Sequence, residues 1–124
     1  METIKARAAF LSAAKGPKVV TSGFVLQAFD REDNGPFRVG FTCSKKVGNA
    51  VERNAAKRRL RALAQTVMPE LARDGWDYVL IGRTGETESR DFAQMQGELK
   101  RALTTLNEQA DPVPSEEPDG PGMG

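Results

Sequence analysis

The first half of the chain alternates between apolar segments and polar breaks in a way that predicts one helix followed by strands. A helix is expected over residues 4–15, and Gly16-Pro17 ends it because proline cannot continue a helix. Segments rich in β-branched and aromatic residues predict strands over 19–21, 24–29 and 37–43. The last of these alternates apolar and polar positions, as a strand with one buried face does.

The second half predicts two long helices around one strand. Helical spacing of apolar residues extends from residue 50 to about 67, and Met68-Pro69 is expected to end or kink this helix. A short helical turn is expected to follow over residues 70–73. Residues 77–82 form the most apolar run and predict a central strand. Ser89 is expected to cap a last helix. The apolar stripe of that helix consists of Phe92, Met95, Leu99, Leu103 and Leu106.

These elements indicate an α+β fold, a single-domain sandwich with helices on a mainly antiparallel sheet. The predicted order is α-β-β-(β)-α-β-α, where the extra strand depends on a break near Ser22-Gly23. The domain is expected to span residues 1–107. Residues 108–124 hold five acids, no base, four Pro and three Gly, and this composition predicts a disordered tail.

The central segment from Lys45 to Arg61 concentrates positive charge. It holds seven basic residues and one acid, a net charge of +6, whereas the whole chain carries only +1. Asn49 and Glu52 have the spacing of a capping box, which predicts a helix start at this point.

The basic residues within that helix fall on one exposed side. Arg53, Lys57 and Arg61 are four apart, and Asn54 and Arg58 form a parallel row beside them. Like charges at this spacing repel one another. A solvated helix face usually mixes both signs, so the pattern favours binding of a polyanion such as a nucleic acid.

This segment resembles a known family. The run Ser44-Lys45-Lys46-Val47-Gly48-Asn49-Ala50-Val51, followed by Arg53-Asn54 and Lys57-Arg58, is similar to the motif of the bacterial ribonuclease P protein subunit, and the resemblance covers roughly residues 4–106. One position departs from the family's frequent Arg-Asn-Arg, because Ala55 takes the place of the second Arg. One contact to RNA is therefore missing or displaced to Arg59.

The resemblance implies a function and a topology. In that family the RNA subunit is the catalyst, and it cleaves the 5′ leader from precursor tRNA with bound Mg²⁺. The protein subunit binds the catalytic RNA and the leader, raises the affinity of the RNA for metal ions and is inactive alone. No metal bound by the protein itself is expected. The resemblance also implies a left-handed crossover at the basic helix.

Two groups of site residues follow from the resemblance. The surface for the catalytic RNA is expected to comprise Lys45, Lys46, Arg53, Asn54, Lys57, Arg58 and Arg61. The cleft for the single-stranded leader is expected to comprise Phe10, Ala14, Val25 and Gln27. The family often has two Phe four residues apart where this chain has Phe10 and Ala14. Phe10 is equally consistent with simple packing.

Composition limits the other function classes. The chain has no histidine, and its carboxylates do not cluster as a metal-dependent nuclease requires. The acidic loop with Asp30, Glu32 and Asp33 is more typical of a solvated turn than of a Mg²⁺ site. A binder of ribosomal or other structural RNA and a self-sufficient nuclease remain the alternatives.

The single Cys43, in an apolar strand, predicts an inert thiol. Without a signal peptide or a long apolar run, we expect a cytoplasmic protein that binds neither membrane nor DNA.

Overall fold

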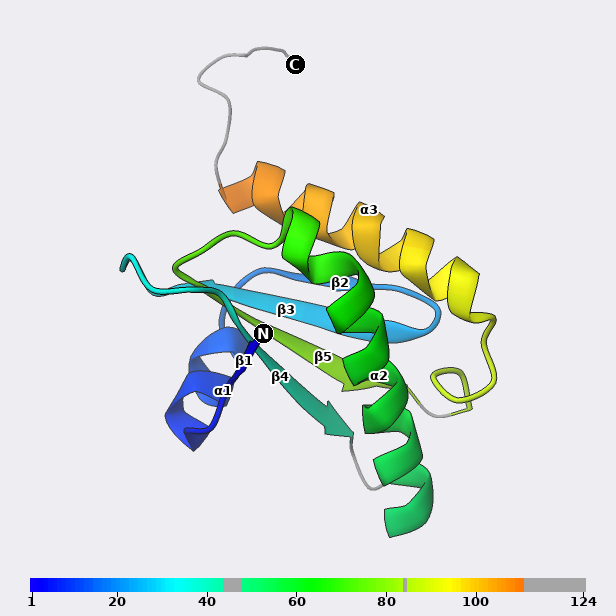
Figure 1. Ribbon diagram of the computed structural model, residues 1–124. Helices are drawn as coiled ribbons and strands as arrows, with labels where there is room; N and C mark the ends of the chain where they lie inside the picture. Colours follow the sequence, from blue (N-terminus) through cyan, green and yellow to red (C-terminus); the bar gives the residue numbers. More distant parts are fainter. Residues whose placement is uncertain (44–47, 84, 111–124) are drawn as a thin grey trace.

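The computed structural model describes residues 1–43, 48–83 and 85–110. Strands and helices follow one another in the order β-α-β-β-β-α-β-α within these residues (Figure 1). Their bounds are β1 Glu2–Thr3, α1 Arg7–Ala14, β2 Lys18–Val20, β3 Phe24–Asp30, β4 Arg38–Cys43, α2 Ala50–Leu71, β5 Trp76–Gly82 and α3 Phe92–Ala110.

The strands form one mixed sheet in the order β1-β4-β5-β3-β2. The β2–β3 and β3–β5 pairs are antiparallel, whereas β1–β4 and β4–β5 are parallel. The α+β class and the strand break near Ser22-Gly23 are confirmed, but the sheet is less antiparallel than predicted. Two features account for the difference: β1 is a short strand that the sequence pattern did not reveal, and α2 returns the chain so that β5 runs alongside β4.

The connection from β4 through α2 to β5 is left-handed. Figure 1 shows α2 on the viewer's side of the sheet, with β4 below β5 and both strands running from left to right. The chain leaves β4, passes through α2 on the viewer's side of the sheet and enters β5 above β4. With both strands pointing to the right, this path is a left-handed crossover. Most strand-helix-strand units turn the other way, so this arrangement agrees with the topology that the resemblance implies.

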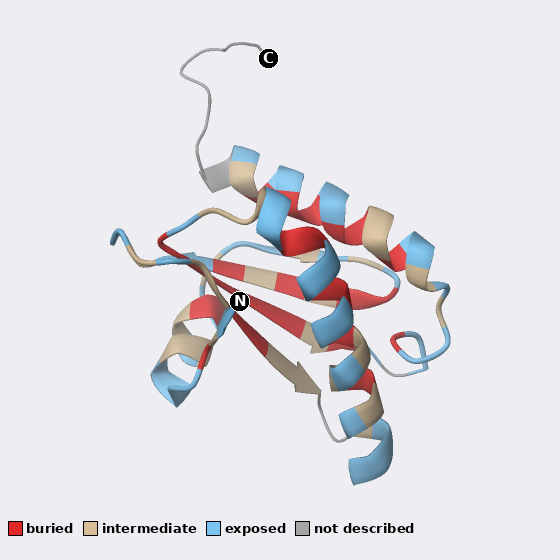
Figure 2. Cartoon of the chain, viewed as in Figure 1, coloured by how far each residue is buried: buried red, intermediate tan, exposed pale blue. Residues whose placement is uncertain are grey.

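Helices cover both faces of the sheet. The main core lies under α2 and α3, whose sides toward the sheet are coloured as buried in Figure 2. Leu60, Leu63, Leu99 and other buried apolar residues join Tyr78 of β5 in this core. A smaller cluster on the opposite face joins Ala13 of α1 to Ile4 and Val79, with Ala9, Phe10 and Ile81 packed against it. Because β5 presents residues alternately to the two faces, it anchors both clusters.

The start of α2 forms as predicted. Glu52 N–H donates to Asn49 Oδ1 and Asn49 N–H donates to Glu52 Oε1, both at 2.9 Å, which completes the capping box. Gly48, with φ of 146°, makes this possible, because a β-carbon there would lie 2.2 Å from Glu52 Oε1. Val51 was expected on the apolar side of this helix with Leu60, Leu63 and Val67, but it is 76% exposed.

Several element boundaries differ from the predictions. α1 begins at Arg7, later than expected. α2 includes Pro69 and ends at Leu71, within the short helical turn expected after the proline. α3 is capped by Asp91, whose Oδ2 accepts from Gln94 N–H at 3.1 Å, whereas the Ser89 hydroxyl donates to Gly85 O at 2.7 Å. α3 runs to Ala110, into the expected tail, and residues 111–124 lie outside the described part of the chain.

The acidic loop is held by arginine. Asp77, only 1% exposed, accepts hydrogen bonds from Arg31 at 2.6 Å and from Arg38 at 2.8 Å. Arg31 also donates to both carboxylate oxygens of Asp33, at 2.9 and 3.0 Å. The hydrogen bond from Arg31 lowers the pKa of Asp33 below its ordinary value. The loop therefore lies at an end of the sheet that is held by ion pairs.

Among the described residues, no helix is long and apolar enough to cross a bilayer.

Candidate nucleic-acid interface

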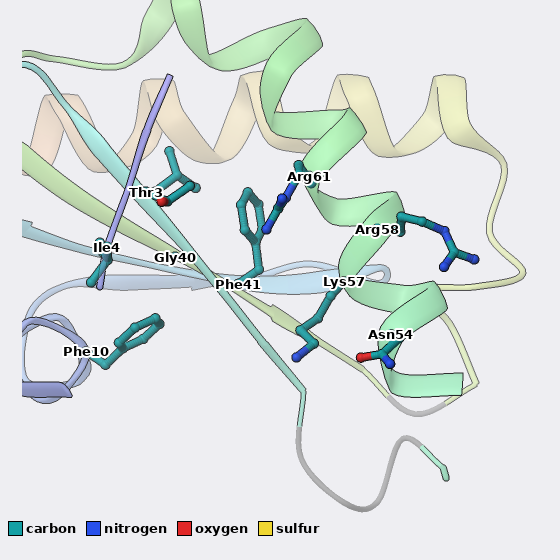
Figure 3. Close-up of a pocket in the computed structure, with 10 residues that line it drawn as sticks. Thr3, Ile4, Phe10, Gly40, Phe41, Asn54, Lys57, Arg58 and Arg61 are labelled. Atoms are coloured by element: carbon teal, nitrogen blue, oxygen red, sulfur yellow. The ribbon is translucent and has the colours of Figure 1, made fainter. Parts of the chain in front are cut away.

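The exposed side of α2 and the neighbouring β4 enclose a basic groove. Its cavity has a volume of about 420 Å³ and lies where α2, β4 and the N-terminal segment meet (Figure 3). The lining residues are Thr3, Ile4, Phe10, Val39, Gly40, Phe41, Asn54, Lys57, Arg58 and Arg61. Four of the residues predicted to bind RNA therefore lie around one concave surface.

Arg61 lies over the ring of Phe41. Its guanidinium carbon is 5.4 Å from the ring centroid, a distance at which a cation and an aromatic face attract each other. Figure 3 shows this pair at the wall of the basic groove, with Lys57 extending on the same side of α2. Phe41 was not predicted as a site residue, because strand alternation placed it on the core face with Val39. Its half-buried position could not be read from that pattern.

Arg53 and Arg59 have structural partners. Arg53 Nη1 donates to Gly48 O at 2.8 Å and so braces the turn that precedes α2. Arg59 donates to the backbone carbonyls of Glu88 and Arg90, and its guanidinium carbon lies 5.8 Å from the ring centroid of Phe92. Arg59 therefore fastens the segment between β5 and α3, so its guanidinium already has partners within the chain.

Two predicted RNA-binding residues cannot be placed. Lys45 and Lys46 lie outside the described residues. The described residues on either side of them are Cys43 and Gly48.

Burial raises the pKa of the Cys43 thiol above its ordinary value, which agrees with the prediction of an unreactive group. The residue is half-buried rather than fully enclosed.

A second cavity lies between α1 and the sheet, and we call it the α1 cleft. Its volume is about 560 Å³, and its lining residues are Lys5, Arg7, Phe10, Ala14, Gln27, Phe41, Thr42, Val79 and Ile81. Phe10, Ala14 and Gln27 are thus brought together as predicted. Val25 does not line this cavity. The segment that follows α1 contacts β3 at Ala28, because Ala28 N–H donates to Pro17 O. Val25 lies three residues before Ala28, near the start of β3 and away from this contact.

Phe10 belongs to both cavities. Its ring lies against Gly40 of β4, where an added β-carbon would be 2.6 Å from Cε1 and 2.7 Å from Cζ. The ring is half-buried. Phe10 therefore packs onto the sheet and also presents an edge to the basic groove and to the α1 cleft. Phe41 is likewise shared, so the two cavities meet along these aromatic residues.

Comparisons with known proteins show the family of the chain. A family model described as Ribonuclease P matches residues 1–107. The chain belongs to the ribonuclease P protein family. The ribonuclease P protein component of Ruegeria pomeroyi is 48% identical over 109 residues, covering 86% of this chain and 87% of that protein. The corresponding protein of Gluconacetobacter diazotrophicus is 52% identical over 101 residues, covering 81% and 86%.

Solved structures of ribonuclease P proteins share the fold. The protein from Staphylococcus aureus superposes with a TM-score of 0.67 at 29% identity, covering 85% of this chain and 94% of that one. The protein from Thermotoga maritima gives a TM-score of 0.67 at 25% identity, covering 87% and 97%. The ribonuclease P family implies a role in tRNA processing for the chain.

Proposed function

We propose that this chain is the protein subunit that binds the catalytic RNA of ribonuclease P and the 5′ leader of precursor tRNA, and so promotes Mg²⁺-dependent endonucleolytic maturation of the tRNA 5′ end. One observation carries the proposal. In the described part of the chain, Lys57, Arg58 and Arg61 surround a concave surface and make no ion pair with a carboxylate. Such a surface has unused charge that a phosphate backbone satisfies.

The basic groove is proposed to contact the catalytic RNA. Lys57, Arg58 and Arg61 supply positive charge, and the Asn54 side chain supplies hydrogen-bonding groups beside them. Arg53 contributes by holding the carbonyl of Gly48 at the start of α2. We also assign Lys45 and Lys46, which precede Gly48 in the sequence, to this surface. Placing these cations between two polyanions lowers their mutual repulsion and releases counterions, so binding weakens steeply as salt rises.

The α1 cleft is proposed to hold the leader. Unpaired bases stack on aromatic rings, and Phe10 offers a half-buried ring at the junction of the two cavities. Gln27 and Ala14 form the rest of the wall, with Val25 further along β3. The small Ala14 leaves space where a second ring would add to the stacking surface.

We place the chemistry on the RNA. The chain has no histidine, and the described residues contain no group of three Cys, Asp or Glu side chains arranged to hold a metal ion. Asp33 and Asp77 are engaged by Arg31 and Arg38, so the donor set does not fit a resident Mg²⁺. The catalytic Mg²⁺ is accordingly proposed to bind the RNA subunit, in a cytoplasmic complex that acts on RNA rather than DNA.

The deciding experiment compares cleavage of precursor tRNA by a bacterial catalytic RNA with and without this protein. We expect the protein to lower the Mg²⁺ concentration needed for cleavage and to be inactive alone. Cleavage by the purified protein alone, abolished by a point substitution in the chain, would indicate a self-sufficient nuclease. Tight binding of the catalytic RNA without any change in the Mg²⁺ requirement would indicate a general structural-RNA binder.

A further inference from the structure

We propose that a third cavity, between β2 and α3, binds an unpaired nucleotide through an exocyclic amino group of its base and through its phosphate. The β2–α3 cavity has a volume of about 440 Å³. Its lining residues are Val19, Val20, Thr21, Ser22, Glu98, Arg101, Ala102 and Thr105. It lies at the β2 edge of the sheet, whereas the basic groove lies beside β4 toward the opposite edge. The two sites are therefore separate.

Glu98 supplies the first observation. This side chain is only 7% exposed and lines the cavity. Arg90 Nε donates to Glu98 Oε2 at 2.8 Å, and Arg90 Nη2 pairs with the same oxygen. Glu98 Oε1 has no hydrogen-bond partner in the part of the chain that the structure describes. A buried acceptor without a donor is costly, so a group that donates to Oε1 is favoured at this place.

Charge limits what that donor is. Arg90 already compensates the Glu98 carboxylate, so a cation at Oε1 would add an excess positive charge. Arg101, which is exposed, lines the same cavity and makes no ion pair among the described residues. The site therefore matches a neutral N–H donor joined to an anion. It does not match a metal ion, a polyamine or a lysine side chain.

A nucleotide combines those two groups. Cytosine, adenine and guanine carry a neutral exocyclic amino group that donates to a carboxylate oxygen, whereas uracil carries none. The nucleotide phosphate matches the guanidinium of Arg101. Val20, a 58% exposed aliphatic side chain on β2, offers the base an apolar surface.

The neighbouring surface continues the path for a phosphate backbone. A shallower hollow of about 310 Å³ is lined by Lys100, Arg101, Thr104 and Thr105, and it shares Arg101 and Thr105 with the β2–α3 cavity. A base in the cavity would place its phosphate toward Arg101, and the next phosphate toward Lys100. An RNA segment bound here would be distinct from one in the basic groove.

The test is an amide-resolved NMR titration of the full chain with CMP and, separately, with UMP. We expect CMP to shift the amides of Val20, Ala102 and Thr105 and to bind roughly fivefold more tightly than UMP at this site, the effect of one hydrogen bond. In Glu98→Gln, the side-chain amide oxygen takes the place of Oε2 as the acceptor for Arg90, and the amide NH₂ takes the place of Oε1. The preference should then reverse toward UMP, whose uracil O4 is an acceptor.

Two further variants separate the site from its alternatives. Arg101→Ala should weaken CMP and UMP equally, because it removes the phosphate contact, and Lys57→Ala in the basic groove should leave the CMP preference unchanged. Equal shifts with both nucleotides, or none near Val20, would overturn the proposal. Shifts that depend on protein concentration without nucleotide would assign the cavity to a second copy of the chain. If Glu98→Gln unfolds, the CMP and UMP contrast in the parent still decides. Failure here leaves the proposed function untouched.

Discussion

The ring of Phe10 on α1 lies directly on the backbone of Gly40 in β4, with no space for a β-carbon between them. This contact sets the position of the aromatic residue that joins the basic groove to the α1 cleft. The absence of a side chain at Gly40 therefore determines the position of the Phe10 ring.

Gly40→Ala should displace the Phe10 ring. The new methyl group would lie 2.6 to 2.7 Å from two ring carbons, and overpacking of this kind costs about 1–3 kcal/mol. We expect a lower Tm and a smaller gain in affinity from a 5′ leader. Gly97→Ala is the matched control, because its β-carbon meets only Arg101 Nη1, at 3.5 Å, and alanine favours a helix. Equal leader affinity in both variants would contradict the role of Gly40.

Phe10→Ala should reduce leader affinity selectively. The loss should appear with precursor tRNA that carries a leader of several nucleotides, by about 1–3 kcal/mol for one stacked base, and should be absent with leaderless tRNA. Ala14→Phe should increase leader affinity by adding a second ring to the α1 cleft. Binding measurements on both substrates test this, and equal losses on both would show that Phe10 only packs.

Arg58→Ala should weaken binding of the catalytic RNA without destabilising the domain. Arg58 is exposed at the basic groove, and no hydrogen bond or ion pair holds its side chain in the described structure. We expect a loss of about 1–3 kcal/mol and a salt slope smaller by roughly 0.7–0.9. Titrations at several salt concentrations measure both. An unchanged slope would remove Arg58 from the interface.

Arg59→Ala, unlike Arg58→Ala, should destabilise the domain and leave the salt dependence of RNA binding unchanged. Arg59 donates to two backbone carbonyls and lies over Phe92, so its loss leaves acceptors without a donor. We expect a lower free energy of unfolding, by about 1–3 kcal/mol, and an unchanged salt slope for RNA binding. Chemical denaturation and RNA titration on the same sample distinguish the two roles. A stable variant with weak RNA binding would place Arg59 at the interface.

Cys43 should react slowly with alkylating agents. Burial raises its pKa, so less thiolate is present in the folded chain than in the unfolded chain at the same pH. The pH at which the alkylation rate is half-maximal should be higher for native than for urea-unfolded protein. By linkage, the stability that this thiol contributes is complete below its unfolded pKa and declines as pH rises toward the folded pKa. Identical pH profiles would contradict this assignment.

Local sequence signals predicted the parts of the site that depend on local structure. The capping box of Asn49 and Glu52 fixed the start of α2, and from that start the helical period places Asn54, Lys57 and Arg61 on one side. The break at Ser22-Gly23 was also readable, because β2 and β3 form a hairpin between near neighbours in the chain.

The features that were missed depend on distant partners. β1 has only two residues and exists because Ile4 N–H donates to Val39 O and the strand pairs with β4. No periodicity can be detected in so short a segment. Pro69 lies in the last turn of α2, where it removes one donor, and the packing of Val67 and Met68 helps to hold the helix as far as Leu71. The roles of Phe41 and Arg59 likewise follow only from tertiary contacts.

The position of β5 has a consequence for the order in which the chain folds. β3 and β4 are consecutive in sequence, but neither pairs with the other, and both pair with β5. During synthesis, the first half of the chain therefore has no central strand on which to assemble until Gly82 has left the ribosome. Contacts of such long sequence separation slow folding. The basic residues of α2 are thus synthesised before the sheet that shapes the basic groove exists.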